Sequence, residues 1–84
     1  MNPQDIKSTV KTFILSEYLP GEDPVALTDT TPLLTTGILD SIAVLKVVTF
    51  LENQFGIVIQ PHEAVVENLN TLSDIERFVV SKKG

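Results

Sequence analysis

The chain lacks cysteine and tryptophan altogether, and its 84 residues include a single histidine. Without cysteine it can form no disulfide and supplies no thiolate of its own for catalysis or metal binding. The one histidine, His62, cannot build a zinc cluster alone, and we expect it at the surface near a helix start. No G-x-S-x-G elbow surrounds Ser41. We therefore predict no metal site and no catalytic site, and a protein that is not an enzyme.

Basic residues are scarce as well. Six Lys and Arg stand against eleven Asp and Glu, for a formal net charge of −5. Nucleic-acid binding requires basic surface that neutralises phosphates, so we predict no nucleic-acid partner. The N-terminus has no basic region followed by an apolar run, and no apolar run is long enough to span a membrane. These absences predict a cytoplasmic protein without a membrane partner.

The length predicts one small domain over residues 1–84, acting as a monomer, with a modest core and little room for a deep substrate pocket. Hydrophobic residues make up 43% of the chain, which is too many for a disordered segment. No internal repeat or low-complexity segment is present. We expect a single globular unit.

Helical spacing of apolar residues predicts three longer helices and a short one. The first covers Pro3–Tyr18, with Asn2 as its cap. The second begins at Asp40 or Ser41 and ends at Phe55, because Gly56 is suited to a helix stop. The short third helix is expected from Pro61 to Val66. Thr71 caps the last, and its predicted buried face consists of Leu72, Ile75, Phe78 and Val79.

Residues 19–40 show no helical period and contain several prolines and glycines. A loop this long in a small domain tends to be functional. We expect its apolar residues to pack on the helices, with one helical turn near Val25–Leu27. These residues are Val25, Leu27, Leu33, Leu34, Ile38 and Leu39. The segment GIVIQP is β-branched, but no other segment offers it a partner strand, so we predict an extended connector.

The second helix has two apolar faces on a helical wheel. The predicted core stripe consists of Val44, Val47, Val48, Leu51 and Phe55. Away from it, Ile42, Leu45 and Thr49 form a ridge beside Ser41. The ridge is flanked by Lys46 and Asn53. The pattern alone leaves two interpretations open, because such a ridge can be a partner surface or merely isolated exposed apolar residues.

The Asp40-Ser41 pair at the start of this helix also allows two interpretations. Either side chain could cap the helix by accepting a hydrogen bond from a free backbone N–H. Alternatively, Ser41 could carry a phosphate ester, which would lie near the unpaired N–H groups of the first turn. A loop junction would leave its hydroxyl accessible to another enzyme. Local spacing does not separate the two.

A longer stretch, GILDSIAVLKVVTFLENQFGIVI, resembles the second-helix region of acyl and peptidyl carrier proteins. That region has D-S-[LI] after a loop glycine, then a Val/Leu-rich helix that ends in a Leu-Glu…Phe-Gly-Ile pattern. LTDTTPLLTTGILDS is similar to the first loop of the family, and LNTLSDIERFV to its last helix. The resemblance covers nearly the whole chain. It implies an all-α fold, a four-helix bundle of the acyl carrier protein type with a long first loop and a short third helix.

The resemblance implies that Ser41 is the attachment point of 4′-phosphopantetheine. A phosphopantetheinyl transferase would move this arm from coenzyme A to the serine oxygen with Mg²⁺, and Asp40 would contact the transferase. The arm's thiol would carry an acyl or aminoacyl group as a thioester. The implied partners are this transferase, an acyl- or aminoacyl-activating ligase or adenylating enzyme, and downstream synthases, transferases or tailoring enzymes.

Family resemblance also places partner contacts along the second helix. We expect an apolar centre of this interface at Ile42 and Leu45, with Thr49 beside it. Asp40, Lys46 and Glu52 are expected at its charged rim.

The chain departs from the carriers of bacterial fatty acid synthesis, which are strongly acidic along this helix. Ala43, Lys46, Asn53 and Gln54 stand where acids are common there, and Glu52 remains. This favours a freestanding carrier of specialised metabolism, of the nonribosomal peptide or polyketide type. Two alternatives stay open: a carrier of primary fatty acid synthesis, and a helical interaction domain whose Asp-Ser pair only caps a helix. The sequence does not name the cargo.

Overall fold

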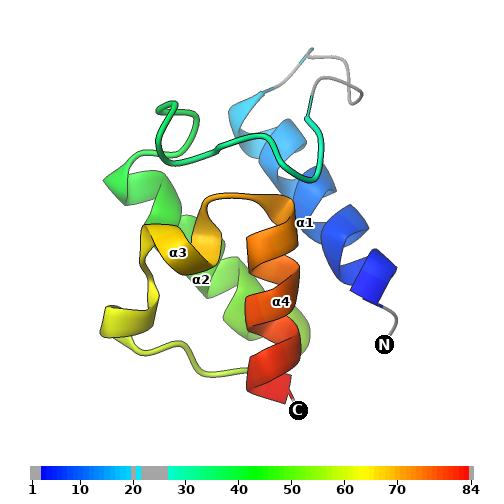
Figure 1. Cartoon of the computed structure of the whole chain (residues 1–84), viewed down its shortest axis with the longest axis vertical. Helices are drawn as coiled ribbons and strands as arrows, with labels where there is room; N and C mark the ends of the chain where they lie inside the picture. Colours follow the sequence, from blue (N-terminus) through cyan, green and yellow to red (C-terminus); the bar gives the residue numbers. More distant parts are fainter. Residues whose placement is uncertain (1–2, 20, 22–26, 84) are drawn as a thin grey trace.

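The computed structural model of the chain describes residues 3–19, 21 and 27–83. The described part is helical and contains no strand. Its elements are the helices α1 (Pro3–Tyr18), α2 (Ser41–Phe55), α3 (Val66–Leu69) and α4 (Leu72–Lys83), with a 3-10 turn, η2 (Pro61–Glu63), before α3 (Figure 1). The predicted all-α class with four helices is confirmed.

The limits of the long helices follow from local signals. Gly56 adopts the left-handed conformation (φ 65°), and its N–H donates to the Glu52 carbonyl oxygen at 3.0 Å, which ends α2 as predicted. Thr71 Oγ1 accepts a hydrogen bond from the Asp74 N–H at 3.0 Å and so caps α4. The cap predicted at Asn2 lies outside the described residues.

The predicted third helix, Pro61–Val66, is wrong in detail. The chain forms the single turn η2, breaks at Ala64 and Val65, and only then forms α3. Val65 is extended (φ −124°, ψ 165°). The Glu63 carbonyl, which a continuing helix would need as an acceptor, accepts a hydrogen bond from the Asn68 side-chain amide at 2.8 Å instead. This side-chain bond competes with the helical one.

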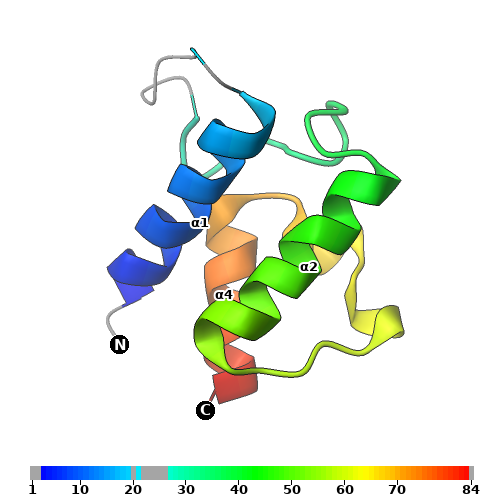
Figure 2. The same cartoon turned by 180° about the vertical axis from the view of Figure 1, so that it is seen from behind.

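Helix α4 contacts each of the other three helices and carries the centre of the core. Helices α1 and α2 lie on the side of α4 that faces the viewer in Figure 2. The four predicted buried residues of α4 are all buried. They pack with buried residues of the two long helices: Ile6, Val10 and Ile14 from α1, and Ala43, Val47, Leu51 and Phe55 from α2.

The long loop packs on this core, as expected. Leu27, Leu33 and Leu39 are completely buried, while Leu34 and Ile38 are half-buried. The loop passes over the N-terminal end of α4 (Figure 1), where the Ser73 N–H donates to the Asp29 carbonyl oxygen at 3.1 Å. Val25 and most of the turn predicted near Val25–Leu27 lie outside the described residues. The connector after Gly56 is extended, as predicted, with Ile57 and Ile59 buried and Val58 exposed.

The predicted core stripe of α2 needs a correction. Val47, Leu51 and Phe55 are buried, but Val44 and Val48 are only half-buried. Their place at the centre is taken by Ala43, of which 4% is exposed. A helical wheel weights side chains by hydrophobicity, so a small alanine counts for little on it. In the folded chain, Ala43 shares the i, i+4 row of Val47 and Leu51, which faces the core.

Leu51→Ala tests the corrected assignment of which residues of α2 face the core. Leu51 is 0% exposed, so its truncation should lower the free energy of unfolding by about 2–5 kcal/mol. Val48→Ala, on the half-buried edge, should cost less than half as much. Urea titration of both variants measures the difference. Equal losses would contradict the assignment of Val48 to the edge of the stripe.

Candidate functional site

The junction between the long loop and α2 is built around Asp40. Asp40 is the N-cap, with extended backbone (φ −91°, ψ −174°), and its Oδ1 accepts the Ala43 N–H at 2.8 Å. Ser41 is therefore the first helical residue, and its side chain is not the cap. Its side chain is exposed and makes no hydrogen bond to another described residue. Of the Asp40-Ser41 pair, Asp40 is therefore the residue that caps α2.

Two open grooves meet at Ser41. One, of about 460 Å³, lies between α2 and the connector and contains no ionisable side chain. Its lining is Ser41, Val44, Leu45, Val48, Ile59, Gln60, Pro61 and Ala64. The other, of about 620 Å³, extends toward the loop and α3 and includes the carboxylates of Asp40 and Glu67. The exposed hydroxyl thus stands between an apolar groove and an acidic one.

Asn70 fixes the loop wall of the second groove. Its Oδ1 accepts hydrogen bonds from the N–H groups of Leu34 (3.0 Å) and Thr35 (3.3 Å), and its carbonyl oxygen accepts the Leu33 N–H at 2.6 Å. The loop then turns at Gly37, whose φ of 81° suits glycine and whose N–H donates to the Leu34 carbonyl. Sequence reasoning missed Asn70, because its partners lie more than thirty residues away in the chain.

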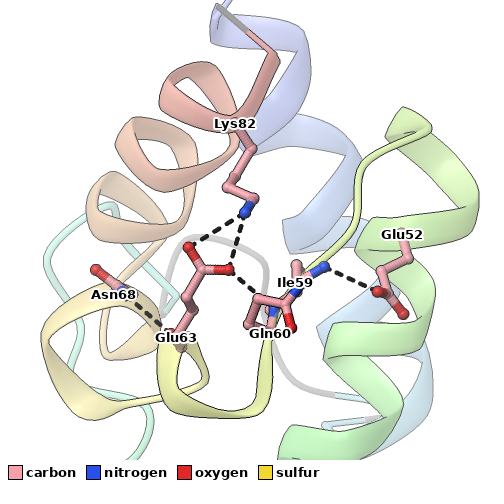
Figure 3. A network of polar contacts seen from close by, with 6 residues as sticks. All are labelled: Glu52, Ile59, Gln60, Glu63, Asn68 and Lys82. Atoms are coloured by element: carbon pink, nitrogen blue, oxygen red, sulfur yellow. Dashed lines mark hydrogen bonds and ion pairs between the residues drawn. The ribbon is translucent and has the colours of Figure 1, made fainter.

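A polar network holds the connector, which forms one wall of the first, apolar groove (Figure 3). The Glu52 carboxylate accepts the Ile59 N–H at 2.9 Å and ties the connector to α2. Glu63 accepts the Gln60 N–H at 2.8 Å and pairs with Lys82 of α4 at 2.8 Å. The hydrogen bond from Lys82, with that from the Gln60 backbone, lowers the pKa of Glu63 below its ordinary value of 4.5. The connector is therefore held from two helices.

The exposed face of α2 carries most of the predicted interface. Ile42 is 67% exposed and Leu45 66%. Lys46 and Thr49 are also exposed, and the Thr49 hydroxyl donates to the Leu45 carbonyl oxygen at 3.0 Å. Glu52 differs, because it is half-buried and its carboxylate is directed to the connector. The first four share one outer face near Ser41, whereas Glu52 is engaged within the chain.

Two further sequence features concern charge. Ala43 is buried, so its lack of charge says nothing about the surface of α2. His62 is exposed on η2, as expected. Within the described ranges, no group of three His, Cys, Asp or Glu residues could hold a metal ion. In the same part of the chain, none of the helices has the length and apolar character needed to cross a membrane.

Comparison with protein families supplies the decisive observation. The family model described as phosphopantetheine attachment site matches residues 14–79, which is most of the chain. The chain belongs to this family. It is a carrier protein of the acyl and peptidyl carrier type, and the family carries covalently attached 4′-phosphopantetheine. Such carriers work with a phosphopantetheinyl transferase and with acyl-handling enzymes. A search among curated proteins gives no match. Family membership sets aside the interpretation as an interaction domain without an arm.

Glu63→Gln tests whether the ion pair of Glu63 with Lys82, which holds the connector, stabilises the fold in a pH-dependent way. Because the pKa of Glu63 is lower in the folded chain, the unfolded state binds more protons between the two pKa values. The stabilisation is therefore present above the unfolded pKa and is lost as the pH falls through the lowered one. Urea titrations should show wild type more stable than Glu63→Gln at neutral pH, with the difference shrinking below pH 4.5.

Glu67→Gln is the matched control, because Glu67 is exposed and has no ion-pair partner among the described residues. It should show a smaller difference from wild type at every pH. A Glu63→Gln difference that persists unchanged into acid would contradict the role of the ion pair.

Proposed function

We propose that Ser41 is the residue that receives 4′-phosphopantetheine. The matched residues 14–79 contain three serines, Ser16, Ser41 and Ser73. Ser73 is half-buried at the start of α4, and Ser16 lies within α1. Ser41 alone of the three lines both grooves at the start of α2. This exposed hydroxyl, between two grooves, is the observation that carries the proposal.

The surroundings of Ser41 fit a phosphodiester. The Ala43 and Val44 N–H groups bond to Asp40, while those of Ser41 and Ile42 have no partner among the described residues. These two groups lie at the positive end of α2, where a phosphate is stabilised. The apolar groove beside them can receive the hydrocarbon parts of the arm or its cargo. The thiol of the arm supplies the thioester chemistry that a chain without cysteine cannot.

The Ser41 oxygen attacks the coenzyme A phosphorus that bears the pantetheine arm, its proton passes to a base of the transferase, and the pyrophosphate bond breaks with release of adenosine 3′,5′-bisphosphate. The transferase also supplies the Mg²⁺. Asp40 Oδ1 is occupied by the Ala43 N–H, but Oδ2 has no partner among the described residues. Asp40 is thus able to cap α2 and to contact the transferase at the same time. The carrier performs no catalysis of its own in this proposal, acts in the cytoplasm as a monomer, and consists of one domain, 1–84.

The charge of α2 favours a carrier of specialised metabolism over one of primary fatty acid synthesis. The charged side chain on its outer face beside the apolar pair is a cation, Lys46. The acid that the sequence leaves on this helix, Glu52, bonds to the connector instead. Carriers of fatty acid synthesis present acids here. A panel of loading assays with adenylating enzymes, acyl ligases and a malonyl transferase separates these pathways and identifies the cargo class, amino acid or acyl group.

We also propose that partners dock on the outer face of α2. Ile42 and Leu45 are the exposed apolar centre, Thr49 extends it, and Asp40 and Lys46 form the rim. Thr49 suits this place because its hydroxyl is satisfied by the Leu45 carbonyl. The role of Glu52 at the rim stays a prediction in competition with its bond to Ile59. Apolar anchors dominate the affinity of such an interface, and rim charges mainly steer association.

Ser41→Ala separates attachment from stability. It should abolish attachment of the arm when the protein is incubated with coenzyme A and a broad-specificity transferase. Intact-mass spectrometry measures this result. Stability should change by no more than about 0.5 kcal/mol, because the hydroxyl is exposed and Asp40 provides the cap. Ser16→Ala, at another exposed serine, should still be modified. Modification of Ser41→Ala, or none of wild type, would refute the assignment.

Leu45→Asp tests the docking face. It should leave the melting temperature nearly unchanged, because Leu45 is 66% exposed, yet reduce the loading rate by the activating enzyme at least about tenfold, as expected for an interface anchor. Val58→Asp is the matched control: Val58 is equally exposed but lies past the far end of α2. Lys46→Glu should have a smaller effect that weakens at high salt. Equal losses for Leu45→Asp and Val58→Asp would exclude this face.

A further inference from the structure

One residue links the α3–α4 junction to the loop that precedes the attachment site. Asn70 accepts three backbone N–H groups from consecutive loop residues, Leu33, Leu34 and Thr35. Two of these bonds go to the side-chain oxygen and one to the backbone carbonyl. The side chain is half-buried, so the bonds are partly shielded from water. No other side chain in the described part of the chain accepts two backbone N–H groups of this loop.

The link continues from the loop to Ser41. The Leu39 N–H donates to the Leu33 carbonyl oxygen at 2.9 Å, which closes the loop segment 33–39 on itself. Asp40 follows directly and caps α2, so the segment that Asn70 contacts leads straight into the cap and Ser41. Leu34 and Gly37, within the closed segment, line the groove that Ser41 shares.

We propose that Asn70 is a positioning residue for attachment of the arm. This inference rests on the proposed role of Ser41. The Asn70 side chain holds segment 34–37 in the conformation that the transferase recognises, and it touches neither coenzyme A nor the serine oxygen. Removing the side-chain oxygen leaves the Leu33–Asn70 backbone bond in place. The fold therefore survives, while segment 34–37 samples other conformations.

The kinetic consequence is specific. When a protein populates its binding-competent conformation only in part, its apparent dissociation constant rises by the inverse of that fraction. The chemical step stays the same once the complex forms, because the base and Mg²⁺ belong to the transferase. Loss of the Asn70 side chain should therefore raise KM for the carrier and leave kcat unchanged.

Asn70→Ala, compared with Asn70→Asp, tests this proposal. The alanine removes the acceptor, whereas the aspartate keeps an oxygen at the same position. Amide exchange measured by NMR should become up to about tenfold faster at Leu34 and Thr35 in Asn70→Ala, as expected for the loss of one hydrogen-bond acceptor. Exchange at Ala43, whose partner is Asp40, should stay the same. With the transferase, KM should rise roughly three- to tenfold and kcat should change less than about twofold. Asn70→Asp should restore both readouts.

Asn68→Ala is the matched control for exchange. Asn68 lies two residues away, but its amide bonds to the Glu63 carbonyl and not to the loop, so Leu34 and Thr35 should exchange as in wild type. If Asn70→Ala is too unstable to assay, Asn70→Ser replaces it. The serine side chain is too short to reach both N–H groups, so the same changes in exchange and KM are expected.

Unchanged exchange at Leu34 and Thr35, or faster exchange with unchanged KM, would overturn the positioning role. A loss in kcat alone would overturn it too. Failure of the wild type to be modified on Ser41 would instead refute the proposed function, and the exchange data would still report whether Asn70 holds the loop.

Discussion

The core of this small carrier includes three leucines of the long loop, which belong to no helix. Leu27, Leu33 and Leu39 are buried as fully as the residues of α4, although they come from the loop between α1 and α2. A small domain buries a limited fraction of its surface, so each further buried side chain adds appreciably to its core. The loop is consequently a structural element, and the segment that leads to Ser41 is held by the packing of these leucines and by the hydrogen bonds of Asn70.

The acidic composition of the chain does not make the exposed face of α2 acidic. Several carboxylates are engaged within the chain: Asp40 at the α2 cap, Glu52 on the connector, Glu63 with Lys82, and Asp29 with Lys7. Around Ser41 the surface is therefore apolar and hydroxylated, with one cation on α2 and carboxylates on the loop and α3 sides. Net charge describes the field at a distance, whereas a docking enzyme meets the individual groups.

The sequence predicted what depends on near neighbours in the chain. The stop of α2 at Gly56 and the cap of α4 at Thr71 rest on contacts within four residues. The predicted bounds of α1 and α2 agree with the structure, whereas α4 continues to Lys83 through the end that was expected to fray. The errors involve groups that come together only in the fold. Asn68 takes the Glu63 carbonyl and interrupts the predicted third helix, and α2 is rotated so that Ala43 faces the core. Asn70 was missed for the same reason, and the contact of Glu52 with Ile59 was not foreseen.

The two groove walls are held by separate sets of contacts. Asn70 anchors the loop wall, whereas Glu52, Glu63 and Lys82 anchor the connector wall, and within the described residues none of these four side chains bonds to both walls. Effects of substitutions at distant sites without shared partners add independently. A substitution in one of these sets therefore leaves the side-chain bonds of the other in place, so the loop side and the connector side of Ser41 can be altered one at a time.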